Sequence, residues 1–396
     1  MEECHLKYNF DEIVDRKNTD SLKYDFAIER GKPEGILPLW VADMDFKTPP
    51  EVIEALIEKS NHGIFGYTES KNDYFEVLQD WFQNNFSWKI EREWLVKTPG
   101  IVYAICTAIR TLTNKGDAVI IQQPVYYPFS ESVLINERKL VVNELVYSEG
   151  KYTIDFDDFE KKIIENNVKV FILCNPHNPV GRVWTSDELI QLGDICINHG
   201  VLVVSDEIHA DFIYPGFKHI IFADLKPEFS NISITCTAPS KTFNLAGLQI
   251  SNIFISNREI KHRFKTEIVK SGYSQLNSMG IAACKAAYSY GNEWLHELKE
   301  YLVGNLNFVR SFVAEKLPQL KLIEPEGTYL IWLDFNKLGL NEKQLEDLII
   351  NKAGLWLDAG TMFGQGGDGF QRINIACPRI ILEKALNQLE QAINSL

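Results

Sequence analysis

Three polar segments of the chain carry residues that could act together on one substrate. Asn178 lies in the run Asn-Pro-His-Asn-Pro-Val-Gly-Arg, Asp206 in Ser-Asp-Glu-Ile-His, and Lys241 in Ala-Pro-Ser-Lys-Thr. A lysine amine can form an imine with a carbonyl group, a buried carboxylate can keep an aromatic nitrogen protonated, and a polar side chain can contact a ring hydroxyl. An enzyme that depends on pyridoxal phosphate needs these three groups, so the combination predicts a pyridoxal phosphate site.

Each of the three segments follows a stretch with the pattern of a buried β-strand. Apolar runs at 169–174, 201–205 and 232–235 are separated by stretches with helical spacing. This alternation is typical of an α/β fold with a mostly parallel sheet covered by helices on both faces. In open parallel sheets, ligands bind beyond the carboxyl ends of the strands. The three polar residues should therefore converge on one cleft.

The pattern of elements changes near residue 290, which divides the chain into unequal parts. We expect an N-terminal arm over 1–45 that joins a small domain, a large cofactor-binding domain over 46–290, and a small α+β C-terminal domain over 291–396. The large domain should begin with a helix that has Thr48 as its N-cap and two prolines in its first turn. A chain of 396 residues is long enough for two packed domains.

Several residues near the three segments could also hold the cofactor. Gly100, Ile101 and Val102 open a predicted helix, and free backbone N–H groups at such an end favour a phosphate. Ser240, next to the lysine, could bind the same phosphate, and Tyr126 could stack on a pyridine ring. Taken alone, each of these residues is as easily explained by a turn or by core packing.

Further candidates concern the substrate and proton transfer. Tyr127 could assist proton transfer, and Lys241 could carry the Cα proton of a bound amino acid. Arg372 lies on an alternating strand of the small domain, where its guanidinium could bind a substrate carboxylate; a surface ion pair is the alternative. His209 should line the cofactor cleft. Neither His177 nor His209 has metal-ligand spacing, so we expect no metal.

The composition indicates a globular enzyme and argues against other classes. A formal charge of −14 is unsuited to binding nucleic-acid backbones. Seven cysteines without regular spacing, Cys4 among them, are expected to be mostly buried free thiols. The chain shows no signal-peptide pattern, and no apolar stretch reaches about 18 residues, so we expect a cytoplasmic protein without a membrane span.

Several blocks of the sequence resemble the fold-type I pyridoxal phosphate enzymes of the aspartate aminotransferase superfamily. More narrowly, they resemble the MalY/PatB group of cystathionine β-lyases. The most specific blocks are Leu-Trp-Val-Ala-Asp-Met-Asp-Phe at 39–46 and Ala-Pro-Ser-Lys-Thr-Phe-Asn-Leu-Ala-Gly at 238–247. Shorter blocks lie at 65–68, 124–129, 174–182, 205–211 and 370–379. The resemblance covers nearly the whole chain and implies a mostly parallel, seven-stranded type of sheet.

The resemblance also implies a role for each candidate in the cleft. Lys241 would bind the cofactor covalently, and Asp206 would face its pyridine nitrogen. Asn178 would contact the ring hydroxyl, and Tyr126 would stack on the ring. Arg372 would bind the α-carboxylate of an amino-acid substrate.

Other implied roles concern the neighbouring subunit and the backbone. Tyr67 would reach the cofactor phosphate of the neighbouring subunit, which implies a homodimer with shared active sites. Val41 and Ala42 would lie near the substrate through their backbone. Many aspartate-type aminotransferases carry a phosphate-binding arginine eight residues after the lysine, where this chain has Gln249. Phosphate binding should then depend on backbone N–H groups, Ser240 and Tyr67, which fits the lyase branch better.

The reaction that we expect is an α,β-elimination. L-cystathionine or another cysteine S-conjugate would yield a thiol, pyruvate and ammonia. An aminotransferase uses the same groups and is the first alternative, because fold and cofactor do not fix the reaction type. A regulator that binds pyridoxal phosphate without turnover is the second alternative, and the intact set of candidate residues argues against it.

Overall fold

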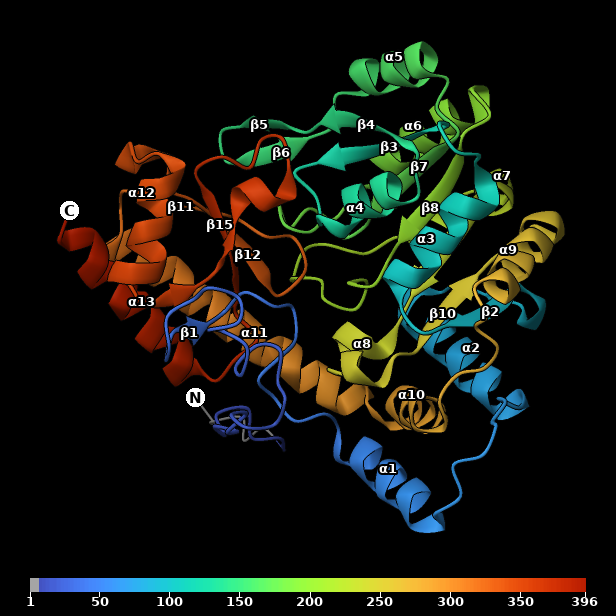
Figure 1. Cartoon of the computed structure of the whole chain (residues 1–396), viewed down its shortest axis with the longest axis horizontal. Coiled ribbons are helices and arrows are strands. Elements are labelled where there is room, and N and C mark those ends of the chain that lie inside the picture. Colours follow the sequence, from blue (N-terminus) through green and yellow to red (C-terminus); the bar gives the residue numbers. More distant parts are fainter. Residues whose placement is uncertain (1–6) are drawn as a thin grey trace.

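A seven-stranded sheet organises the larger part of the computed structural model, which describes residues 7–396 (Figure 1). The strand order is β2-β10-β9-β8-β7-β3-β4. Neighbouring strands are parallel except for β10, which is antiparallel to both of its neighbours. The bounds are β2 (Leu95–Thr98), β3 (Ala118–Gln123), β4 (Lys139–Glu144), β7 (Val170–Cys174), β8 (Leu202–Asp206), β9 (Ser233–Thr237) and β10 (Ser251–Phe254). The expected mostly parallel α/β sheet is confirmed.

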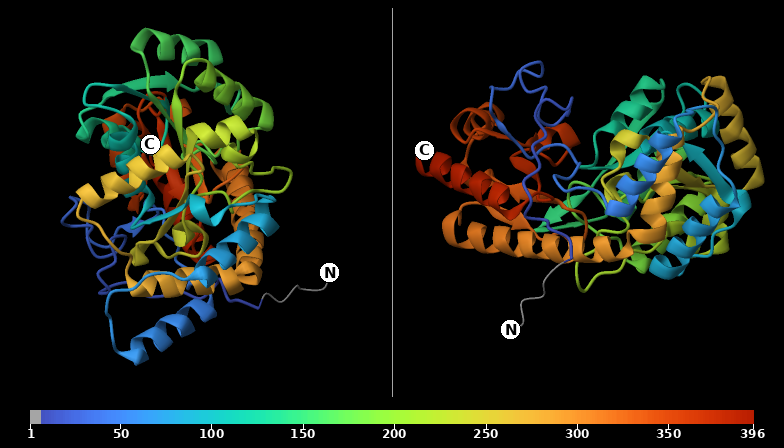
Figure 2. Two further views of the ribbon diagram at one scale, coloured as in Figure 1. Left: turned by 90° about the vertical axis from the view of Figure 1, so that its right-hand side faces the viewer. Right: turned by 90° about the horizontal axis from the view of Figure 1, so that it is seen from below.

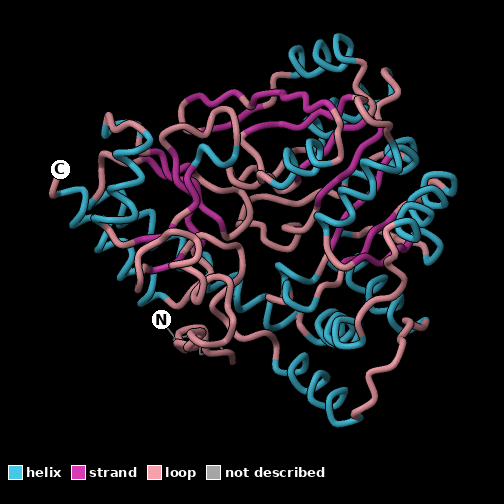
Figure 3. Tube along the Cα trace, viewed as in Figure 1, coloured by secondary structure: helices cyan, strands magenta, loops and turns pink. Residues whose placement is uncertain are grey.

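Helices cover both faces of this sheet, as Figure 3 shows. Alternate strand residues point to opposite faces: Val170 and Ile172 belong to one apolar cluster, and Phe171 and Leu173 to the other. The first cluster contains residues of α3 (Ile101–Leu112), α4 (Pro128–Ile135) and α9 (Arg258–Lys270). The second contains residues of α5 (Phe156–Asn166), α6 (Ser186–Asn198) and α7 (Pro227–Ile232). A short hairpin joins β5 (Val146–Ser148) to β6 (Lys151–Thr153).

The first helix begins differently from the expectation. In α1 (Pro50–His62) the N-cap is Pro49, and no side chain caps the helix. Thr48 therefore lies outside the cap position, and its buried hydroxyl has no partner within residues 7–396. The helix begins at Pro50 because proline has a helical φ and needs no partner for an N–H group. Two further helices, α2 (Asn72–Phe86) and α10 (Ser278–Tyr290), pack against each other near α1.

The C-terminal part contains a separate antiparallel sheet with strand order β11-β12-β15-β14. The long helix α11 (Asn292–Lys316) leads into it and spans both parts of the molecule (Figure 2). The strands are β11 (Lys321–Ile323), β12 (Leu330–Asp334), β14 (Asp358–Ala359) and β15 (Phe370–Asn374). The helices are α12 (Glu342–Asp347), which continues as a π-helical turn, and α13 (Arg379–Asn394).

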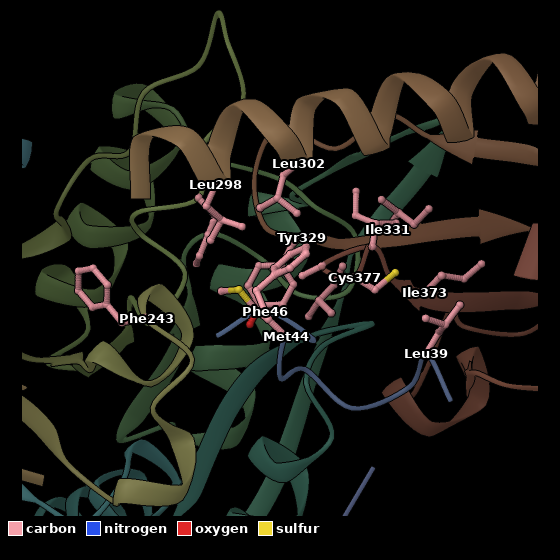
Figure 4. Packing of buried hydrophobic residues seen from close by; sticks show 14 of the residues in the cluster. Leu39, Met44, Phe46, Phe243, Leu298, Leu302, Tyr329, Ile331, Ile373 and Cys377 are labelled. Carbon is pink, nitrogen blue, oxygen red and sulfur yellow. The ribbon is translucent and has the colours of Figure 1, made fainter. Parts of the chain in front are cut away.

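The N-terminal segment packs onto this C-terminal part. Its strand β1 (Leu37–Pro38) pairs in parallel with β13 (Leu355–Trp356). Leu39, Met44 and Phe46 lie among side chains of α11 and the C-terminal sheet in one apolar cluster (Figure 4). The arm thus contacts the C-terminal part through both the strand pairing and the apolar cluster.

Buried ion pairs fix the end of the arm near the sheet. The Lys23 ammonium is fully buried and lies 2.8 Å from Asp45 and 3.7 Å from Asp43. Arg16 binds the same two carboxylates at 2.7 and 2.8 Å. A buried charge is tolerated only when it is paired and hydrogen-bonded. This cluster therefore holds the segment that follows Val41 in one conformation.

Other sequence expectations can be compared with residues 7–396. Their cysteines are free thiols; Cys106 is half-buried and the others are buried, whereas Cys4 lies outside the described residues. Within the described range, no group of His, Cys, Asp and Glu could hold a metal ion. None of its helices is long and apolar enough to cross a bilayer.

A single glycine tests the packing of α6 against α7. A Cβ atom at Gly193 would overlap the Phe229 ring, so Gly193→Ala should lower the free energy of unfolding by about 1–3 kcal/mol. Helix propensity alone predicts the opposite sign, a gain of about 0.5–1 kcal/mol. Urea unfolding decides between them, with Gly66→Ala as the control because that site is exposed and has open space around it. A stabilised Gly193→Ala variant would contradict the packing.

Candidate active site

The register of three parallel strands brings the predicted residues together. Cys174 of β7 lies opposite Asp206 of β8, which lies opposite Cys236 of β9. Asn178 follows the first of these strands within a few residues, and Lys241 follows the third on the short helix α8 (Pro239–Thr242). The three residues therefore meet at the carboxyl edge of the sheet, as the sequence predicted.

Most predicted residues line one cavity of about 450 Å³. These lining residues are Ala42, Gly100, Ile101, Val102, Tyr126, Asn178, Asp206, His209, Ser240 and Lys241. Gln249 also lines the cavity. Six further lining residues were not predicted from the sequence: Pro99, Tyr103, Cys174, Ile208, Ala246 and Ile250. A larger cavity of about 670 Å³ lies beside α2 and α9 and contains none of the predicted residues. The smaller cavity is the candidate site because the predicted reactive side chains line it, even though its volume is not the larger of the two.

The Lys241 side chain is half-buried, and its amine lies against the arm. Its Nζ donates a hydrogen bond of 2.7 Å to the backbone carbonyl of Ala42. Burial lowers the pKa of Lys241 to about 8; Arg372 also lowers it, whereas Asp43 and Asp206 raise it. An amine of this kind is partly neutral near physiological pH, so it can act as a nucleophile or as a base.

Asp206 is a buried carboxylate with few neighbouring groups that stabilise its negative charge. Its Oδ1 accepts a hydrogen bond of 3.1 Å from the backbone N–H of Ile208. Burial raises the pKa of Asp206 to about 7; Glu207 also raises it, while Lys241 lowers it. His209, on the same loop, is neutral because burial lowers its pKa to about 3. A cationic ring nitrogen beside Asp206 would supply the positive charge that stabilises its carboxylate.

Arg372 lies beside the cavity and not on the surface. Its Nη1 donates to Asn178 Oδ1 at 3.0 Å, and its Nη2 donates to the carbonyl of Trp40 at 2.8 Å and to Asp358. The guanidinium stands 5.0 Å from the centre of the Phe363 ring. The alternative of a surface ion pair is therefore wrong, because the pair with Asp358 is buried.

The remaining predicted residues, Tyr127, Val41 and Tyr67, do not line the cavity. Tyr127 is half-buried at the start of α4, with its ring 5.5 Å from that of Tyr126. The carbonyl of Val41 accepts a hydrogen bond from Asn374 at 2.8 Å. The Tyr67 side chain is 98% exposed. Tyr67 therefore has little contact with its own chain and is free to reach another molecule.

Tyr329 is a site neighbour that the sequence analysis missed. It is fully buried, and its hydroxyl donates to the Ala42 carbonyl at 3.0 Å, the same oxygen that accepts from Lys241. Its ring meets that of His209 edge to face at 5.9 Å. Tyr329 precedes an apolar strand, where a tyrosine is an ordinary core residue, so the sequence carried no separate signal for it.

The residues present fit pyridoxal phosphate. A nucleophilic lysine and an undercompensated carboxylate face one cavity. The N-terminus of α3 opens at the same cavity, with Gly100 as its N-cap and no side chain capping it. The first backbone N–H groups of such a helix and its dipole favour a phosphate. This donor set matches a ligand with a carbonyl, a ring nitrogen and a phosphate.

The raised pKa of Asp206 has a consequence for stability. Asp206 has a pKa of about 7 in the folded state, against the ordinary 3.8. Protonated Asp206 therefore stabilises the folded protein relative to the ionised form. This stabilisation is complete below about pH 4 and is lost as the pH rises through 7. Asp206→Asn, which cannot ionise, should stabilise the cofactor-free protein by about 1 kcal/mol at pH 4.5 and about 4 kcal/mol at pH 8. Urea unfolding measures both values, with exposed Asp20→Asn as the control. An equal gain at both pH values would contradict the assignment.

Known proteins are similar to this chain in sequence and fold. Residues 34–389 match the family described as aminotransferase class I and II. The cystathionine beta-lyase PatB of Bacillus subtilis is 43% identical over 98% of this chain and 100% of its own length, and the protein MalY of Escherichia coli is 32% identical with the same coverage. Cystalysin from Treponema denticola, whose crystal structure contains pyridoxal 5'-phosphate, is 39% identical over 98% of this chain and 99% of that one, with a TM-score of 0.95. The chain belongs to the aminotransferase class I and II family.

Proposed function

We propose that this chain is a pyridoxal phosphate-dependent carbon–sulfur β-lyase that acts on L-cystathionine or related cysteine S-conjugates. The observation that carries the proposal is the meeting of Lys241, Asp206 and Asn178 in one cavity. The relative named cystathionine beta-lyase, 43% identical over 98% of this chain, supports the same reaction. The products would be a thiol, pyruvate and ammonia.

Lys241, Asp206 and Asn178 would hold the cofactor ring. Pyridoxal phosphate, when bound, supplies an aldehyde for amino groups and a ring that accepts the electron pair left at Cα. Lys241 would attach to it covalently, Asp206 would keep its pyridine nitrogen protonated, and Asn178 would contact its hydroxyl. Tyr126 would stack on the ring, and His209 would line its pocket.

The phosphate would bind at the opening of α3. The backbone N–H groups of Gly100, Ile101 and Val102 and the hydroxyl of Ser240 all belong to residues that line the cavity. Gln249, which lines it as well, has no charge to offer in place of an arginine. We therefore infer that the phosphate is bound by helix N–H groups and hydroxyls, with Tyr67 of the partner subunit as a further donor.

Proton transfer would depend on Lys241 and Tyr127. Lys241, once free of the cofactor, would take the Cα proton while the Ala42 carbonyl orients its amine. The bond between Cβ and sulfur would then break, with the electron pair leaving on sulfur. Burial raises the pKa of Tyr127, so Tyr127 stays protonated and could give a proton to the sulfur. Arg372 would hold the α-carboxylate beside Val41 and Ala42 throughout.

The enzyme's assembly, domains and cellular compartment are part of the proposal. We propose a homodimer in which Tyr67 completes the partner's site. The domains would cover 1–45, 46–290 and 291–396, with the seven-stranded sheet in the second and the four-stranded sheet in the third. The free cysteines are typical of a reducing compartment, so we propose a cytoplasmic enzyme.

Loss of the lysine amine tests the reaction. Lys241→Ala should lower pyruvate release from L-cystathionine by at least about a thousandfold, because it removes both the covalent attachment and the base. Exposed Lys337→Ala is the matched control and should keep full activity. Pyruvate is measured with and without an added keto acid. If amino transfer to the keto acid exceeds pyruvate release in the unsubstituted enzyme, the aminotransferase alternative holds instead.

Hybrid dimers test the shared site. Lys241→Ala and Tyr67→Ala should each be strongly impaired as pure proteins. Co-expressed in equal amounts with different affinity tags, they should recover about one quarter of the normal activity, because half of the dimers contain one site with both residues intact. Activity no higher than that of the two parents would show that Tyr67 does not serve the neighbouring subunit.

A further inference from the structure

The proposed anchor for the substrate carboxylate is already paired with a carboxylate of the chain itself. Asp358 on β14 and Arg372 on β15 are cross-strand partners. Their side chains form an ion pair and are only 4% and 3% exposed, respectively. The charge that would attract a substrate is therefore balanced within the described chain.

The hydrogen bonds of Arg372 leave no complete edge for a second carboxylate. Both N–H groups of Nη2 are used, one by Asp358 and one by the carbonyl of Trp40, and Nη1 donates to Asn178. Nε is buried and has no partner within residues 7–396. A guanidinium binds a carboxylate best through two N–H groups on the same edge, and each edge includes one from Nη2. A substrate can bind in this way only if one of these contacts opens.

Asp358 is the contact that can open. The backbone at Trp40 is held in place, because its indole stacks on Trp356 at 4.4 Å. Asp358 instead has the same charge as the incoming carboxylate, and two carboxylates on one buried guanidinium repel each other. Asp358 also lines a separate cavity of about 600 Å³, together with Arg30. It therefore has space to turn into and a cation on that side.

Resting on the function proposed above, we propose that Asp358 is a positioning residue which occupies the carboxylate-binding edge of Arg372 and yields it to the α-carboxylate of the substrate. Without Asp358, the empty site would contain a buried cation without a counter-charge. With Asp358 present, each amino acid must displace it. Asp358 thus sets how strongly the site binds ligands that carry an α-carboxylate, and it leaves ligands without one unaffected.

The proposal also predicts a dependence on pH. The charged and titratable groups around Asp358 are Arg372 on β15, the hydroxyls of Tyr126 and Tyr127 just before α4, and Arg30 from the arm. Burial raises the pKa of Asp358, while Arg372 opposes the shift. As the pH falls, protonated Asp358 ceases to compete, so the affinity for an α-carboxylate should rise relative to that for an amine without one.

The test compares two ligands without a β leaving group on the protein loaded with pyridoxal phosphate. L-alanine carries the α-carboxylate and ethylamine lacks it; the change in cofactor absorbance reports binding of each. Asp358→Asn should lower the Kd of L-alanine about tenfold and change that of ethylamine by less than about twofold. The KM of L-cystathionine should fall while kcat stays nearly unchanged. Binding is read from the first absorbance change and without elimination, so failure of the lyase function would leave this test intact.

Two controls keep the outcome decisive. Glu326→Gln neutralises another buried ion pair, with Arg182 at 2.8 Å, and should leave the ratio of the two Kd values unchanged. If Asp358→Asn does not fold, the unsubstituted protein is titrated from pH 8 to pH 5, where the preference for L-alanine over ethylamine should increase. Weaker binding of L-alanine to Asp358→Asn, an equal change for both ligands, or a preference independent of pH would each overturn the proposal.

Discussion

The parallel register of β7, β8 and β9 is the constraint on which the candidate site depends. These strands are buried on both faces, so a shift by one residue would turn every side chain to the wrong face. With the register fixed, Asp206 ends its strand between Cys174 and Cys236. The residues that follow the neighbouring strands then have to meet at its carboxylate. The relative positions of the reactive side chains therefore follow from the register of the sheet.

Burial shifts the pKa values of the two titratable groups that the sheet brings together. The same loss of water lowers the pKa of Lys241 and raises that of Asp206. Both groups are then less stable in their charged forms than they would be in water, and both gain from a ligand that supplies a carbonyl and a cationic nitrogen. The arm contributes from the opposite side, because Lys23 and its two carboxylate partners fix the segment that presents the Ala42 carbonyl.

The sequence predicted the parts that depend on local pattern. Apolar runs placed the strands, and the residues after them placed Lys241, Asp206 and Asn178 in one cleft. It did not predict the pairing of Arg372 with Asp358 or of Lys23 with Asp45, because these partners meet only through tertiary packing. Thr48 looked like an N-cap by residue type, yet the helix begins one residue later than that cap requires. The resemblance, and not the spacing, suggested Tyr67.

In the proposed reaction, the bond between Cβ and sulfur of the substrate breaks and no amino group is transferred. Purified protein loaded with pyridoxal phosphate is mixed with L-cystathionine in the absence of any keto acid, and pyruvate and free thiol are measured together. An α,β-elimination should give equal amounts of pyruvate and homocysteine over many turnovers. An absorbance response to amino acids without release of pyruvate or thiol would contradict it.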